Sequence, residues 1–323
     1  MRRIVALVLI SLTALPRVAR SQCVGAAQEA FQDRRFDEAR TTVHGQLKAN
    51  PNHGPTLYCM GRVVYATGRS GEAVDWFEKA VKADGNNAVY HLWLANALGE
   101  EAQRANKLRQ PFLARRVKSE FERAVALDPK SIDARHGLIQ FYSVAPGVMG
   151  GSMERAKAEA AEIGKLNAMR GHLEMGALFD REKNAAAAER EYQAALDAAP
   201  DSALAHYSLG GFYQRQKRWD EAFALFERLM QAKPGEVVAH YQYGRTAALS
   251  GQNLERGERE LKALVDEPPK DFAPASVAAT YFRLGNIYEK QGKTDLARSA
   301  YEGAVKLNPK NEEAKKALAA LRS

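Results

Sequence analysis

A small residue recurs at one position of this chain every 34 residues. The series is Ala27, Gly61 and Ala95 and, further along, Gly176, Gly210 and Gly244. Histidines precede the three later glycines by four residues, at positions 172, 206 and 240. A fixed period of this length is typical of a stacked array of repeats and not of a single closed core. The chain is therefore expected to pack each repeat only against its neighbours.

The residues around the small position narrow the type of repeat. The segments 207–213 and 282–288 each carry Leu-Gly with a tyrosine three residues after the glycine. In each repeat an alanine, an aromatic residue and a proline then follow, as Ala222, Phe226, Pro234 and as Ala297, Tyr301, Pro309. This order resembles the tetratricopeptide repeat, a helix-turn-helix unit, over nearly the whole chain. The resemblance implies an all-α, right-handed α-solenoid and a scaffold that holds other proteins.

Small residues also recur in the second helix expected for each unit. A larger apolar residue follows each of them four positions later, on the same helical face. The small residues are Ala39, Ala73, Ala188, Ala222 and Ala297, and their larger partners are Val43, Phe77, Tyr192, Phe226 and Tyr301. Where both helices of a unit lack bulk at the facing positions, they are expected to approach each other closely.

The period predicts about eight units within one superhelical domain, residues 22–323. Their expected bounds are 20–53, 54–87, 88–131, 132–168, 169–202, 203–236, 237–277 and 278–311, with a polar-faced capping helix at 312–323. Three units depart from the period, at Glu100–Leu113, at the glycine-rich turn 145–152 and at the proline-rich segment 268–274. Such insertions are expected in loops.

The N-terminus has the pattern of a secretory signal. Two arginines precede an apolar run from Ile4 to Leu15, which is too short to span a bilayer, and Ala19 and Ser21 suit a peptidase. The expected signal peptide is 1–21, so that the protein is exported to the periplasm or secreted. An uncleaved membrane anchor is the alternative, because Arg17 and Arg20 follow the apolar run. No later stretch is apolar enough to predict a stable membrane span.

The net charge does not predict nucleic-acid binding. The whole chain carries 47 Lys and Arg against 39 Asp and Glu, a net charge of +8. The proposed leader contains four arginines and no acid, so the mature chain has 43 − 39 = +4. A net charge this small does not indicate binding to a nucleic acid.

The only two cysteines are Cys23 and Cys59, expected on the first helices of neighbouring units. A disulfide between them is one prediction for an oxidising compartment. Two unpaired thiols are the alternative, because spacing in sequence does not provide the short Cα separation that a disulfide requires.

No residue pattern predicts catalysis, a cofactor or a metal site. His172, His206 and His240 recur once per unit at an expected core position, with no acidic or thiol partner recurring beside them. The turn 147–152 has glycines but lacks the Gly-Lys-Ser/Thr ending of a phosphate loop. The chain is therefore expected not to be an enzyme.

The expected binding surface is the concave wall formed by the first helix of each unit. Its outward side chains mix aromatics, arginines and amides, the chemistry of peptide-binding hot spots. They are Tyr58, Arg62, Tyr65, Asn96, Gln140, Tyr207, Gln214, Tyr241, Arg245, Phe282 and Asn286. Tyrosines at such positions can instead pack against neighbouring repeats.

These features favour an exported scaffold that holds a peptide segment or helix of another protein. An accessory subunit that positions a partner enzyme, or a protein that recognises a cell-wall polymer, are the alternatives. A basic patch within the third unit contains no acid: Arg104, Lys107, Arg109, Arg115, Arg116 and Lys118. It predicts either a solvated helix extension or contact with an acidic partner or an anionic membrane.

Overall fold

The computed structural model describes residues 26–269 and 272–321, and these residues are almost entirely helical. They contain seventeen α-helices and one short 3₁₀ helix, and no strand occurs among them. The predicted all-α class is confirmed. The predicted signal peptide and Cys23 lie outside the described residues.

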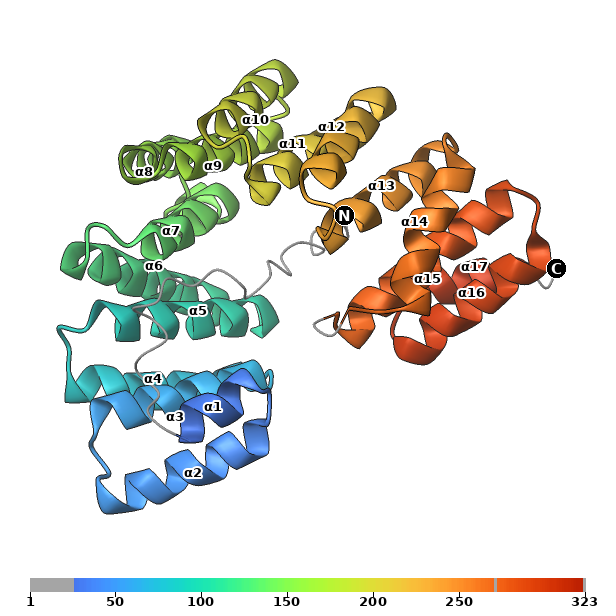
Figure 1. The fold of residues 1–323 in the computed structure, drawn as a ribbon. Helices are drawn as coiled ribbons and strands as arrows, with labels where there is room; N and C mark the ends of the chain where they lie inside the picture. The colour runs from blue at the N-terminus through green and yellow to red at the C-terminus, as the bar shows by residue number, and fades with distance from the viewer. Residues whose placement is uncertain (1–25, 270–271, 322–323) are drawn as a thin grey trace. The chain divides into compact units, whose positions relative to one another are not determined.

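The helices divide after Leu166 into two compact units. The N-terminal unit is built from successive antiparallel helix pairs (Figure 1). Its helices are α1 (Ala26–Gln32), α2 (Phe36–Ala49), α3 (Gly54–Ala66), α4 (Ser70–Ala83), α5 (Ala88–Arg104), α6 (Gln110–Leu127), α7 (Ile132–Val144), η2 (Gly147–Met149) and α8 (Met153–Leu166).

The C-terminal unit repeats the same pairing and ends in a single additional helix (Figure 1). Its helices are α9 (Ala168–Arg181), α10 (Ala185–Ala198), α11 (Ala203–Arg215), α12 (Trp219–Ala232), α13 (Val237–Ser250), α14 (Leu254–Asp266), α15 (Pro274–Lys290), α16 (Thr294–Leu307) and α17 (Glu312–Ala320). Helix α17 buries Ala314, and Leu318 packs against the core formed by α12–α16. It therefore covers the apolar face that the last pair would otherwise expose.

Each repeated glycine receives a large side chain from the second helix of its own pair. The Phe77 ring lies over Gly61, the Phe226 ring over Gly210 and the Tyr301 ring over Gly285, and a Cβ at any of these glycines would overlap that ring. All three rings are fully buried. The small position is therefore required because an aromatic side chain occupies the space of the missing Cβ.

First helices approach each other more closely than second helices do. Within the C-terminal unit α11 contacts α13 and α13 contacts α15, and within the N-terminal unit α3 contacts α5 and α5 contacts α7. No comparable contact joins successive second helices among the described residues. The first helices therefore line the inner side of each unit. We call this surface the first-helix wall.

The turn between the two helices of a pair has a left-handed residue seven positions after the small one. Glycine occupies this position at Gly68, Gly251 and Gly292, whereas Lys183 and Lys217 adopt the same backbone, with φ of 61° and 56°. This left-handed conformation costs a residue with a Cβ about 1 kcal/mol, and glycine is free of that steric cost.

Replacing Lys217 with Gly is expected to raise the free energy of unfolding by up to about 1 kcal/mol, because it removes that steric cost. Thermal or urea unfolding followed by circular dichroism measures the change. The reciprocal variant Gly292→Lys should lose a similar amount. Equal stability of both variants and the wild type would show that these turns carry no such strain.

The extra residues of the third unit lengthen its helices instead of forming a long loop. Helix α5 has 17 residues and α6 has 18, against 13 or 14 for α3 and α4, and only residues 105–109 connect them. The expectation that this insertion forms a loop is wrong. A run without glycine and with proline only at the start of α6 continues the helix readily.

The repeated histidines differ from the prediction. Each of three first-helix histidines contacts a glutamate of the second helix in its own pair, so an acidic partner does recur. The Nδ1–Oε2 distances are 2.6 Å for His91–Glu120, 2.7 Å for His172–Glu191 and 2.6 Å for His240–Glu260. The predicted core position is correct for His206, but the His172 side chain is 41% exposed. These contacts join helices within a pair.

Candidate functional site

A polar network crosses the first-helix wall of the C-terminal unit. Gln214 of α11 donates from Nε2 to Thr246 Oγ1 of α13 at 2.8 Å, and its Oε1 accepts a hydrogen bond from Arg245 Nη1. Arg245 Nη1 also donates to Gln242 Oε1 at 3.2 Å. Gln214 and Thr246 are buried. The network therefore fixes the Arg245 guanidinium through neutral amides.

Arg245 is a partly buried cation with one edge unused. Among the described residues it forms no ion pair, and its Nε and Nη2 donate to no protein acceptor. Burial lowers the pKa of Arg245, and the positive charges of Arg283 and Arg215 lower it further. Nε and Nη2 form the edge that binds a carboxylate through two parallel hydrogen bonds. This edge suits an anionic group from outside the chain.

Arg283 of α15 adds a second cation beside Arg245. Its Nη1 donates to Asn286 Oδ1 at 3.2 Å, its guanidinium lies 4.9 Å from the Phe282 ring centroid, and it has no carboxylate partner among the described residues. By contrast, Arg215 is neutralised by Asp180, with an N–O distance of 2.6 Å. Two positive charges on adjacent first helices thus remain without a counter-charge.

The predicted aromatic anchors of this wall pack against the core. Tyr207 and Tyr241 both lie against the buried cluster of α12–α16, and Phe282 is itself buried. Burial and the neighbouring Glu236 carboxylate raise the pKa of Tyr207. Asn286 donates to Tyr301 Oη at 2.9 Å, so it too is engaged within the repeat. Access for a partner is therefore concentrated at Arg245 and Arg283.

In the N-terminal unit the expectation that Tyr58 and Arg62 are exposed wall residues is wrong. Tyr58 is fully buried and Arg62 is 7% exposed. The Arg62 guanidinium lies 3.7 Å from the Trp93 ring centroid and 5.2 Å from that of Phe31, and it donates to Tyr58 Oη at 2.8 Å. Side chains from α1 and α5 close over α3, so both residues serve packing.

The other predicted residues of this wall are half-buried. Tyr65 meets Trp93 edge-on, with ring centroids 5.6 Å apart, and burial together with Glu100 raises its pKa. Asn96 and Gln140 lie on α5 and α7. Their role in binding stays a prediction.

Half of the predicted basic patch is paired with acids. Arg104 lies 3.4 Å from Glu100, Arg116 lies 2.5 Å from Glu78, and Lys118 lies 3.6 Å from Glu122. The remaining three cations form no ion pair among the described residues and are exposed: Lys107, Arg109 and Arg115. The charge available to a partner is therefore concentrated around the start of α6.

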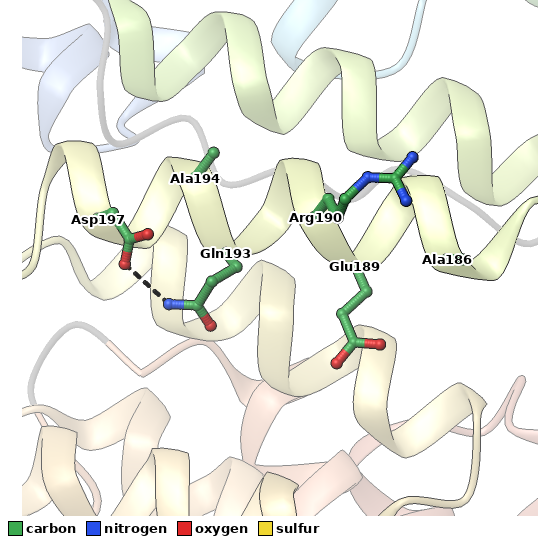
Figure 2. Close-up of a pocket in the computed structure, with 6 residues that line it drawn as sticks. All are labelled: Ala186, Glu189, Arg190, Gln193, Ala194 and Asp197. Atoms are coloured by element: carbon green, nitrogen blue, oxygen red, sulfur yellow. Dashed lines mark hydrogen bonds between the residues drawn. The ribbon is translucent and has the colours of Figure 1, made fainter.

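Two surface depressions lie on second helices. One, of about 740 Å³ between α2 and α4, is rimmed by Lys48, Lys79 and Lys82 and has Trp76 in its lining. The other, of about 430 Å³, runs along α10, where Gln193 donates to Asp197 at 2.8 Å and Arg190 points away from both (Figure 2). All its lining residues belong to one helix, so it does not enclose a ligand.

Three further features bear on the predicted sites. Within residues 26–269 and 272–321, no group of three or more His, Cys, Asp or Glu is arranged to hold a metal ion. No helix in the same ranges is long and apolar enough to cross a membrane. Cys59 is buried, and its predicted disulfide partner, Cys23, is outside the described residues.

One tetratricopeptide repeat family model matches residues 24–88 and again 173–237, and a second such model matches 278–311. Together these ranges span about half of the chain. No curated protein sequence matches it.

Solved structures with the same fold are distant in sequence. A tetratricopeptide repeat protein from Parabacteroides merdae ATCC 43184 is 13% identical, with a TM-score of 0.55 over 95% of this chain and 100% of that one. The APC/C hetero-tetramer Cut9–Hcn1 is 12% identical, with a TM-score of 0.52 over 95% of this chain and 57% of that one. At these identities the likeness extends to the fold alone.

Proposed function

Because the chain belongs to the tetratricopeptide repeat family, whose members generally act as binding scaffolds, we propose that it holds an acidic segment of a partner protein on the first-helix wall of its C-terminal unit. The observation that carries the proposal is the unused Nε–Nη2 edge of Arg245 beside Arg283. The scaffold positions a partner and carries out no reaction of its own.

A carboxylate explains this site better than an apolar or a basic ligand. A partly buried guanidinium without a counter-charge is costly, and a bidentate carboxylate removes that cost while adding two charge-assisted hydrogen bonds. Gln214 and Gln242 hold the guanidinium in one orientation, so little side-chain freedom is lost on binding. An Asp or Glu side chain, or a terminal carboxylate, supplies the required group.

Export of the protein is a second part of the proposal, and it rests on the leader-like residues 1–21. N-terminal sequencing of the protein from its native cells tests this part. A start at Gln22 supports export with cleavage after Ser21, and an intact Met1 or Arg2 contradicts cleavage there.

Arg245→Met is expected to reduce binding of acidic peptides by about 2 kcal/mol or more, in the range of interface hot spots. The measurement uses an array of unrelated acidic peptides, each paired with a copy in which Asp and Glu are replaced by Asn and Gln. The wild type should prefer the acidic member of each pair, and Arg245→Met should lose that preference.

The matched control is Arg190→Met on α10, which removes the same charge from the same unit but on a second helix. It should bind as the wild type does. If the wild type does not distinguish acidic peptides from their amides, or if both variants lose binding equally, the wall is not an acid-binding site.

A further inference from the structure

The four most exposed large apolar side chains of the described residues all belong to the N-terminal unit. Val148 is 96% exposed, Leu108 82%, Phe112 67% and Val144 58%, whereas every other exposed large apolar side chain is at 48% or less. Single exposed apolar residues are ordinary on protein surfaces, but a concentration of the most exposed ones marks an interaction site.

The fold brings these side chains to the turns inside two successive helix pairs. Leu108 lies between α5 and α6, and Phe112 lies in the first turn of α6. Val144 ends α7, and Val148 lies in η2, which contacts α6. Since first helices of successive repeats run in the same direction, the turns that follow them lie along one edge.

The charges around Leu108 and Phe112 are positive and unpaired. Lys107, Arg109 and Arg115 are exposed and have no ion pair among the described residues, and no acid occurs between Arg104 and Lys118 in the sequence. Glu154, at the start of α8, is the exposed acid nearest in sequence to η2, and Lys157 lies 3.9 Å from it. The exposed apolar side chains of Leu108 and Phe112 are therefore flanked by cations and face solvent.

We propose that this edge docks the protein onto an anionic lipid surface, with Leu108 and Phe112 entering the headgroup region and Lys107, Arg109 and Arg115 contacting lipid phosphates. Apolar insertion combined with basic residues is the established physical basis of peripheral membrane binding. An acidic protein partner fits less well, because the apolar side chains project from turns and do not line a groove. The inference is independent of the Arg245 site.

Sedimentation of the full-length protein with vesicles tests the proposal. Binding is expected to vesicles of phosphatidylcholine and phosphatidylglycerol in equal parts, to be much weaker with phosphatidylcholine alone, and to weaken as salt rises. Replacing Lys107, Arg109 and Arg115 with Gln should reduce binding about tenfold or more. Replacing Leu108 and Phe112 with Ser should also reduce it, although no charge changes.

One matched control comes from the N-terminal unit and one from the C-terminal unit. The first control replaces three lysines of the α2–α4 depression with Gln and so removes the same charge: Lys48, Lys79 and Lys82. The second, Leu296→Ser, removes another exposed leucine. Both should bind like the wild type. In the Phe112→Trp variant, brominated acyl chains should quench the added indole fluorescence relative to the wild type, which reports insertion directly.

The proposal fails if the wild type does not bind anionic vesicles, or if the charge controls reduce binding as much as the patch variant does. Binding that survives the Leu108 and Phe112 replacements, without quenching at position 112, also overturns apolar insertion. Preferential binding of the patch to acidic proteins in place of vesicles would assign the edge to a protein partner. Unchanged melting of each variant shows that it remains folded.

Discussion

Replacing Gly210 with Leu is expected to lower the free energy of unfolding by about 2 kcal/mol or more, since overpacking a close helix contact forces strained rotamers and backbone shifts. The Phe226 ring, which is fully buried, occupies the space that a Cβ at Gly210 would need. Chemical denaturation monitored by circular dichroism measures the loss. Even Gly210→Ala should destabilise the protein, although alanine favours helix by about 1 kcal/mol over glycine.

The next residue of the same helix provides the matched control. A Cβ at Gly211 meets only Arg215 Nη1, at 3.5 Å, so Gly211→Ala should leave stability unchanged or raise it by up to about 1 kcal/mol. Opposite signs for two adjacent Gly→Ala substitutions can come only from packing. Two variants of equal stability would contradict the close approach of α11 and α12.

The close approach of the two helices in a pair was predicted from the sequence, because the repeat places a small residue at the same first-helix position many times. The partner at that position differs from the prediction: the sequence indicated that a small second-helix residue such as Ala222 faces the glycine, whereas the aromatic residue four positions later fills its space, as in the pairs Gly61–Phe77 and Gly210–Phe226. Helix class and pairing follow from such local spacing. Periodicity indicates which residues face a partner helix. In a solenoid, few buried helix surfaces face anything else.

Exposure on the wall could not be predicted in the same way. Arg62 and Arg245 occupy similar positions on first helices, yet Trp93 and Phe31 cover Arg62 while amides hold Arg245 at the surface. The difference depends on side chains from neighbouring repeats. Arg283 was missed although it adjoins Phe282, because spacing gives no information on which charges have partners. The His–Glu contacts were missed because the acids lie 19 to 29 residues further along the chain.

Because Arg62 is buried, its replacement is expected to cause a second large loss of stability. Arg62→Ala is expected to lower the free energy of unfolding by about 3 kcal/mol, because it removes stacking on Trp93, leaves Tyr58 Oη without its donor and opens a cavity. Arg69→Ala is the matched control, since Arg69 belongs to the same unit and pairs with Glu72 at 3.0 Å in a partly exposed ion pair, which contributes little.

A double-mutant cycle with Trp93→Leu separates the stacking from the rest of the loss. If the guanidinium–indole contact stabilises the fold, the combined variant should lose less than the sum of the two single losses, by about 1–2 kcal/mol. Strict additivity would show that Arg62 acts only through volume and its hydrogen bond. A stable Arg62→Ala protein that has lost partner binding would instead show that Arg62 is a binding residue. In that case Arg62, which is 7% exposed in the unbound chain, must become accessible when the partner docks.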